Sequence, residues 1–159
     1  MTDPAEILAL CRAKGLKVAT AESCTGGMVG AALTDIAGSS DVYERGVITY
    51  SNAAKQALIG VRAETLDAFG AVSEEVAAEM AAGLLAAAPV DIAVSVTGIA
   101  GPGGSEHKPE GRVCFGLATR DGVATETVEF GALGRAGVRA AATAHALGLI
   151  WAAAARAAA

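Results

Sequence analysis

The stretch that decides the fold is VATAESCTGGMVG, residues 18–30. Its apolar first part ends at Glu22 and is typical of a buried β-strand. Beyond the two glycines, apolar residues recur at the spacing of one helix face, at Met28, Val29, Ala32, Leu33 and Ile36. The stretch therefore predicts a strand that turns sharply into a helix. At this corner the hydroxyl of Ser23 is expected to rise toward solvent beside free N–H groups of the helix start.

The same alternation of strands and helices continues along the chain. Strands are expected at residues 16–22, 47–50, 91–96, 112–119 and 123–130, and helices at 4–14, 24–36, 53–59, 73–88 and 134–157. Residues 41–45 are expected to form one helical turn, and residues 61–69 a loop or short helix. An Arg-Asp-Gly sequence at 120–122 predicts a hairpin between the last two strands. This order predicts a three-layer α/β/α sandwich with a mixed, mostly parallel sheet of about five strands, in one domain over residues 1–159.

Composition narrows the classes of function. The chain is 53% hydrophobic and 18% charged, so a large core is expected. A net charge of −5, with no run of Lys and Arg, argues against nucleic acid as a partner. Three widely spaced cysteines, together with an N-terminus unlike a signal peptide, predict reduced thiols in the cytoplasm. We find no apolar run typical of a membrane span and expect no membrane partner.

Three segments with chemically active side chains each follow a predicted strand. They are residues 22–27, 50–55 and 97–111. Because ligands of such sheets bind beyond the carboxyl ends of the strands, we expect the three segments to meet at one edge. The sequence therefore predicts a single site there.

Ser23 is the first candidate for a nucleophile, although a serine at this position also serves as a helix N-cap. Its activation needs a base, for which the same edge offers Tyr50, Lys55 and Lys108. A partly buried lysine has a lowered pKa and is able to accept the hydroxyl proton. The pattern therefore indicates a Ser–Lys arrangement.

Two other residues compete with Ser23. Ser51 lies four residues before Lys55, within reach on one helix face, but a serine at a helix start is more often its cap. Cys24 is either an alternative nucleophile or a small buried hydrophobic residue.

The glycine-rich segment 98–104 predicts close approach of a ligand to backbone N–H groups. Lys108 and Arg112 follow it and supply cations suited to a phosphate. The segment lacks the spacing of a dinucleotide fingerprint or a P-loop, and the histidines and cysteines lack metal-ligand spacing. No cofactor and no metal are expected.

Four ordered motifs together resemble the CinA C-terminal domain family, which also occurs as a stand-alone nicotinamide-nucleotide amidase. They are AESCTGG at 21–27, TYSNAAK at 49–55, TGIAGPGG at 97–104 and KPEGRV at 108–113. The resemblance implies an α/β/α fold and hydrolysis of the carboxamide of nicotinamide mononucleotide to nicotinate mononucleotide and ammonia. It also implies a homo-oligomer that uses no metal.

Position by position, the resemblance implies that Ser23 is the nucleophile and that Lys55 and Tyr50 activate it. It implies a substrate-binding set of Thr25, Gly26, Gly27, Thr97, Gly101, Gly103, Gly104, Lys108 and Arg139. A different class of function, a non-catalytic nucleotide-binding or assembly module, is predicted to bind such a nucleotide without turnover.

Overall fold

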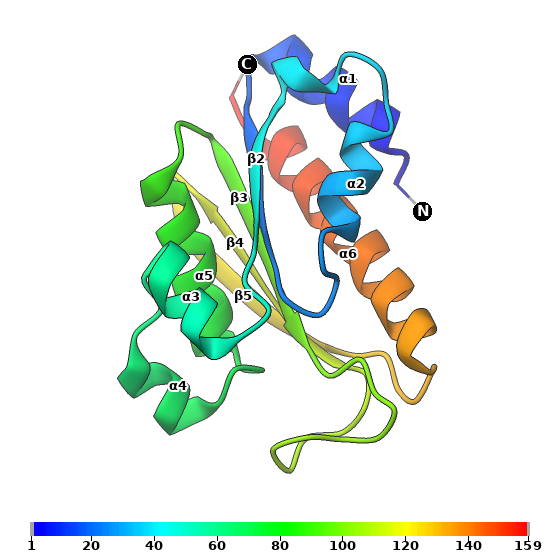
Figure 1. Cartoon of the computed structure of the whole chain (residues 1–159). Helices are drawn as coiled ribbons and strands as arrows, with labels where there is room; N and C mark the ends of the chain where they lie inside the picture. The colour runs from blue at the N-terminus through cyan, green and yellow to red at the C-terminus, as the bar shows by residue number, and fades with distance from the viewer. Residues whose placement is uncertain (1, 159) are drawn as a thin grey trace.

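Five strands form one mixed sheet with helices on both faces (Figure 1). The computed structural model describes residues 2–158. In chain order the strands are β1 (Val18–Glu22), β2 (Tyr43–Ile48), β3 (Ile92–Gly98), β4 (Arg112–Thr119) and β5 (Gly122–Glu129). They lie in the order β2-β1-β3-β4-β5, with β1 parallel to β2 and β3, and with β4 antiparallel to both its neighbours. The predicted α/β/α sandwich and its terminal hairpin are confirmed.

The helices divide between the two faces of the sheet (Figure 1). One face carries α1 (Pro4–Lys14), α2 (Met28–Thr34) and α6 (Arg135–Arg156), and the other α3 (Asn52–Ile59), α4 (Ala63–Phe69) and α5 (Glu74–Ala87). Because both faces are covered, β1 is buried along its whole length and β3 up to its last residue. Helix α6 is long and apolar enough to cross a membrane, but its apolar face packs on this sheet, which accounts for its composition.

The register of the parallel strands brings their ends together. Glu22, the last residue of β1, pairs with Ile48 of β2 on one side and with Val96 of β3 on the other. The segments that follow these three strands therefore leave the sheet at the same edge. The predicted meeting of residues 22–27, 50–55 and 97–111 is confirmed.

Predicted elements differ from the structure around residues 41–50 and at the start of α2. Residues 41–45 were expected to form a helical turn, but a 3₁₀ turn occupies Ser39–Asp41 and β2 begins at Tyr43. Pairing with β1 overrides the local helical preference there. The helix expected from residue 24 begins only at Met28, because residues 23–27 form the turn, with Gly26 and Gly27 at φ of 55° and 107°.

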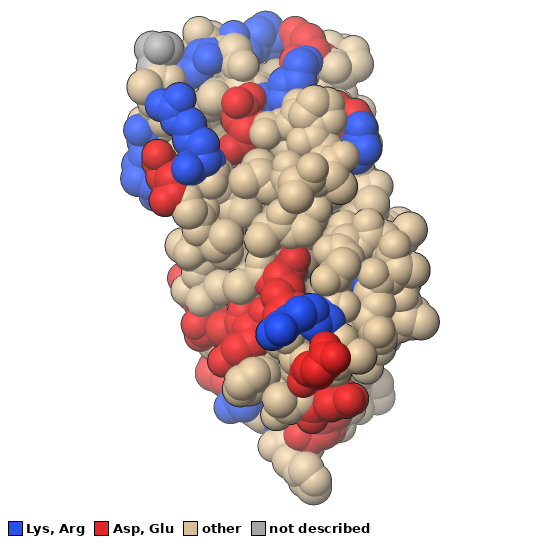
Figure 2. All heavy atoms as spheres, turned by 90° about the vertical axis from the view of Figure 1, so that its left-hand side faces the viewer, with Lys and Arg blue, Asp and Glu red and all other residues tan. Residues whose placement is uncertain are grey.

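Charge is unevenly distributed on the face formed by α3, α4 and α5 (Figure 2). Asp and Glu predominate toward the end of the molecule where α4 lies, and a broad uncharged area separates them from the opposite end. This face therefore lacks the continuous basic surface on which nucleic-acid binding depends.

Candidate active site

Ser23 lies directly beyond β1, in the turn that leads to α2. Its N–H donates a hydrogen bond to the carbonyl of Val96 at 2.9 Å, which ties the turn to β3. Two left-handed glycines then reverse the chain, a conformation that residues with a β-carbon rarely adopt. The side chain is 8% exposed, at a cavity wall. Local sequence thus places a hydroxyl at the edge of the sheet.

The amine of Lys55 meets this hydroxyl. Lys55 lies on α3, and its Nζ is 3.0 Å from Ser23 Oγ. The same Nζ donates to the carbonyl of Thr49 at 2.8 Å and lies 3.5 Å from that of Tyr50. The side chain is only 1% exposed and has no carboxylate within ion-pair distance among residues 2–158. Burial therefore lowers the pKa of Lys55.

A cavity of about 360 Å³ opens beside this pair. Ser23, Tyr50 and Lys55 line it, together with the glycine-rich loop that follows β3. Of the substrate-binding residues predicted from sequence, four line the cavity, namely Thr97, Gly101, Gly103 and Gly104. The cavity volume is that of a small-molecule site.

Arg135 connects two walls of the cavity. It lies at the start of α6, and its guanidinium donates to the hydroxyl of Tyr50 at 2.7 Å and to the carbonyl of Gly101 at 2.7 Å. The hydroxyl of Tyr50 therefore contacts Arg135, whereas only its backbone carbonyl approaches Lys55. The substrate-binding set predicted from the sequence includes Arg139 but not Arg135.

The glycine-rich loop is held in place by polar contacts. The carboxylate of Glu110 accepts hydrogen bonds from the N–H of Gly103 at 2.7 Å and from the N–H of Gly134 at 3.0 Å. The hydroxyl of Thr97 donates to the carbonyl of Ala71 at 2.8 Å. These contacts fix the loop between the start of α6 and the segment before α5.

The remaining predicted residues lie outside the cavity wall. They are Thr25, Gly26, Gly27, Lys108 and Arg139. The ammonium of Lys108 donates to the carbonyls of Phe69 and Val72, at 2.8 and 2.6 Å. Arg139 donates to the carbonyls of Cys24 and Thr25, at 3.0 and 3.4 Å, and so stabilises the turn that contains Ser23.

The expectation of free N–H groups at the start of the following helix is wrong. The N–H groups of Gly27, Val29 and Gly30 all donate to the carboxylate of Glu22, at 3.2, 2.9 and 3.0 Å. Glu22 is only 2% exposed. An acidic residue in a strand that is otherwise apolar was the signal in the sequence for such a role.

Ser51 and Cys24, the two alternatives to Ser23, lie in environments that differ from that of Ser23. Ser51 is exposed and caps α3, because its Oγ accepts from the N–H of Ala54 at 3.0 Å. Cys24 is buried, and burial raises the pKa of its thiol to about 11. A thiol with this pKa is protonated at neutral pH and is a poor nucleophile.

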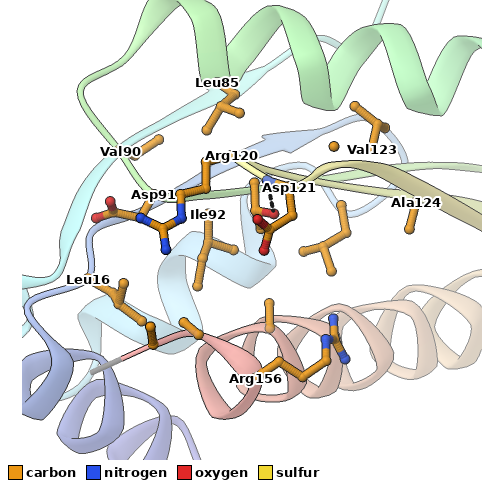
Figure 3. Close-up of a pocket in the computed structure, with 16 residues that line it drawn as sticks. Leu16, Leu85, Val90, Asp91, Ile92, Arg120, Asp121, Val123, Ala124 and Arg156 are labelled. Carbon is orange, nitrogen blue, oxygen red and sulfur yellow. Dashed lines mark hydrogen bonds between the residues drawn. The ribbon is translucent and has the colours of Figure 1, made fainter.

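A larger cavity, of about 560 Å³, lies at the opposite end of the sheet (Figure 3). Its floor is mainly apolar, and Arg120, Asp121, Asp91 and Arg156 stand around it. None of the described residues that line it is Ser, Cys or Lys. Two arginines are balanced there by two carboxylates, whereas the smaller cavity has a serine hydroxyl beside a buried amine.

Comparisons with known proteins agree with this geometry. The sequence model of the CinA C-terminal domain matches residues 2–153. The chain is 56% identical over 141 residues to nicotinamide-nucleotide amidohydrolase PncC of Escherichia coli K12, covering 88% of this chain and 86% of that one. It is 58% identical over 121 residues to a CinA-like protein of Chlorobium phaeobacteroides, covering 74% of this chain but 29% of that longer one.

Solved structures show the same fold. A competence damage-inducible protein A from Klebsiella pneumoniae superposes with a TM-score of 0.90 at 39% identity, covering 98% of this chain and 99% of that one. A competence/damage inducible protein from Agrobacterium tumefaciens gives 0.88 at 45% identity, covering 96% of each chain. On this evidence, the chain belongs to the CinA C-terminal domain family.

Proposed function

We propose that this chain is a serine amidohydrolase that converts nicotinamide mononucleotide to nicotinate mononucleotide and ammonia. The observation that carries the proposal is the buried amine of Lys55, 3.0 Å from the hydroxyl of Ser23 at a cavity wall. The substrate is inferred from the relatives named nicotinamide-nucleotide amidohydrolase, at 56% and 60% identity.

In the first step Ser23 Oγ attacks the carboxamide carbon while Lys55 accepts the hydroxyl proton. A neutral lysine amine has two N–H groups and one lone pair. For the neutral amine we assign these N–H groups to the carbonyls of Thr49 and Tyr50, 2.8 and 3.5 Å away, so the lone pair faces the Ser23 hydroxyl. The same carbonyls stabilise the ammonium that forms once the proton has moved.

In the second step the C–N bond breaks and Lys55 returns the proton to the departing nitrogen, which leaves as ammonia. The product is an ester between Ser23 and the nicotinate carbonyl. A water molecule then attacks this ester, gives its proton to Lys55, and releases nicotinate mononucleotide. The proton passes from Lys55 to Ser23 Oγ, which restores the starting state.

We assign the phosphate of the nucleotide to Arg135 rather than to Lys108. Arg135 lines the cavity, whereas two backbone carbonyls already engage the ammonium of Lys108. A local cation is needed, because acidic residues predominate toward this end of the molecule (Figure 2). Tyr50 provides a wall against which the pyridine ring packs.

The remaining predicted residues complete the proposed site. In the loop 101–104 we assign only the N–H groups of Gly101 and Gly104 to the ribose phosphate, because Pro102 has none and that of Gly103 donates to Glu110. Thr97 supports that loop, and Lys108 holds its far end. Thr25, Gly26, Gly27 and Arg139 shape the nucleophile turn.

The test is ammonia release from nicotinamide mononucleotide, followed together with the appearance of nicotinate mononucleotide. Acid quenching during turnover is expected to trap the nicotinate ester, and mass spectrometry should place it on the peptide that contains Ser23. Saturable binding of the nucleotide without any ammonia would overturn the proposal in favour of a non-catalytic binding module.

A further inference from the structure

The buried carboxylate of Glu22 immediately precedes the nucleophile and has no role in the proton transfers described above. It accepts three backbone hydrogen bonds from the start of α2, two on Oε1 and one on Oε2. The Thr20 hydroxyl lies 3.5 Å from Oε2. A carboxylate that accepts several N–H groups of a helix start is held firmly, because each such bond is charge-assisted.

These bonds join the two ends of the nucleophile turn. Glu22 ends β1, and its donors lie five, seven and eight residues further on, so the carboxylate closes a ring around residues 23–26. Within the ring the N–H of Gly26 donates to the Ser23 carbonyl at 3.0 Å, and that of Met28 to the Thr25 carbonyl at 3.0 Å. The turn therefore has a single hydrogen-bonded shape.

Two N–H groups next to Ser23 take no part in these bonds. Across residues 2–158, the N–H of Cys24 and the N–H of Thr25 donate to no other residue. Cys24 also lines the cavity. Backbone N–H groups next to an attacking hydroxyl are well placed to stabilise the oxyanion of a tetrahedral intermediate.

We propose that Glu22 is the positioning residue of the nucleophile turn. By binding the amides of α2, it holds Ser23 Oγ beside the Lys55 amine and leaves the N–H of Cys24, which lines the cavity, to receive the oxyanion. This inference rests on the proposed amidohydrolase function. The oxyanion donor is then an amide of the turn itself, because Glu22 occupies the N–H groups at the helix start.

The test compares kcat and KM of the wild type with those of Glu22→Gln, on the amide substrate and on its thioamide analogue. The glutamine NH₂ group faces an N–H donor of α2, which opens the ring. A displacement of the reacting hydroxyl by about 1 Å lowers the rate on the order of 100-fold. We therefore expect kcat for the amide to fall by about this factor in Glu22→Gln. KM should stay within about threefold, because Glu22 does not line the cavity.

The thioamide distinguishes positioning from simple loss of folded protein. In the thioamide a sulfur atom replaces the carbonyl oxygen, and sulfur accepts hydrogen bonds poorly. An ordered oxyanion site therefore gives a higher kcat for the amide than for the thioamide, and a disordered site gives a smaller difference. We expect the ratio of amide to thioamide kcat to fall in Glu22→Gln. A smaller folded fraction would lower both rates equally and leave the ratio unchanged.

Ser95→Ala is the matched control. Ser95 is fully buried, and its hydroxyl donates to the carbonyl of Ala77 at 2.6 Å, away from the turn. Losing this bond should lower stability by about 1 kcal/mol and leave both kcat and the thioamide ratio unchanged. If Glu22→Gln does not fold, Glu22→Asp retains the charge but withdraws the oxygens from the amides, and the same ratio is measured.

A folded Glu22→Gln variant with wild-type kcat and an unchanged ratio of amide to thioamide kcat would overturn the inference.

A second reaction, sulfonylation of the serine, separates this outcome from failure of the proposed function. Phenylmethylsulfonyl fluoride transfers its sulfonyl group to an activated serine: an O–S bond forms, fluoride leaves, and Lys55 takes the proton. If the wild type is labelled on Ser23 but releases no ammonia, only the substrate is wrong, and Glu22→Gln should still slow labelling. If neither reaction occurs, both proposals fail.

Discussion

The Nζ atom of Lys55 lies 3.0 Å from the Oγ atom of Ser23, although the two residues are 32 positions apart in the chain. One residue follows β1 and the other lies on the helix that follows β2, and the parallel pairing of these strands brings them together. The amine is buried without a carboxylate partner within residues 2–158, which favours its neutral form.

Ser23→Ala should abolish turnover while Ser51→Ala should not. Without its nucleophile the enzyme is expected to lose about 10⁴-fold or more in kcat, with nucleotide affinity retained. Ser51→Ala removes only the cap of α3, at a cost of about 1 kcal/mol in the free energy of unfolding. Steady-state ammonia release and thermal unfolding of both variants check this. Full activity of Ser23→Ala would remove Ser23 from the mechanism.

Stability and activity should both depend on the titration of Lys55. Its pKa in the folded protein lies below the ordinary 10.5. Between these two values the unfolded chain binds more protons than the folded one, so the free energy of unfolding rises with pH across that window. The value of kcat/KM should rise with pH as well, because only the neutral amine accepts the proton.

The comparison of Lys55→Met with Lys17→Met tests this titration. Lys17 is exposed, so its replacement should leave the pH dependence of the melting temperature as in the wild type. Lys55→Met should lose that alkaline rise in stability and should be inactive at every pH. Parallel stability curves for the wild type and Lys55→Met would show that burial does not perturb this amine.

Arg135→Gln should weaken nucleotide binding with less effect on chemistry. A charge-assisted hydrogen bond contributes about 1.5–3 kcal/mol, so KM for nicotinamide mononucleotide should rise roughly 10- to 100-fold. KM for the riboside, which lacks the phosphate, should change little. The control is Arg120→Gln, which lies at the larger cavity (Figure 3). The KM values of this variant for the mononucleotide and for the riboside should both match those of the wild type. An equal loss for the two substrates would contradict phosphate binding by Arg135.

Cys24→Ala should retain activity. The pKa of the buried thiol is raised to about 11, so almost no thiolate is present at neutral pH. Incubation with iodoacetamide before the ammonia assay should likewise leave turnover of the native enzyme unchanged. Rapid inactivation that Cys24→Ala prevents would identify the thiol as the nucleophile.

Much of this fold followed from local patterns in the sequence. Helix α1 has the predicted bounds, from Pro4 behind the Asp3 cap to Lys14 before a left-handed Gly15. The apolar runs of β1 and β3 indicated strands buried on both faces, which requires a parallel core with helices on each side. Strand β2 was predicted at residues 47–50 but runs from Tyr43 to Ile48, because it lies at an edge and its burial pattern is weak.

The candidate site was predicted less completely. Spacing and residue type pointed to Ser23 and Lys55, but they gave no means to rank Lys108 against Arg135 as the cation of the cavity. Lys108 follows the loop closely in sequence, yet its ammonium binds the carbonyls of Phe69 and Val72. Arg135 lies 34 positions after Gly101 and reaches it only because α6 starts beside the loop.

The sequence by itself determined the strand-to-helix turn at residues 18–30, the sandwich and the common edge of its loops, because hydrophobic period and glycine positions act over short distances. Only the tertiary structure decided that the amine of Lys55 is buried and lies within hydrogen-bond distance of the Ser23 hydroxyl. It also decided that the carboxylate of Glu22 accepts hydrogen bonds from the N–H groups at the start of α2. Burial and hydrogen-bond partners depend on which segments meet in space. The pKa of Lys55 and the set of free N–H groups are therefore properties of the folded chain alone.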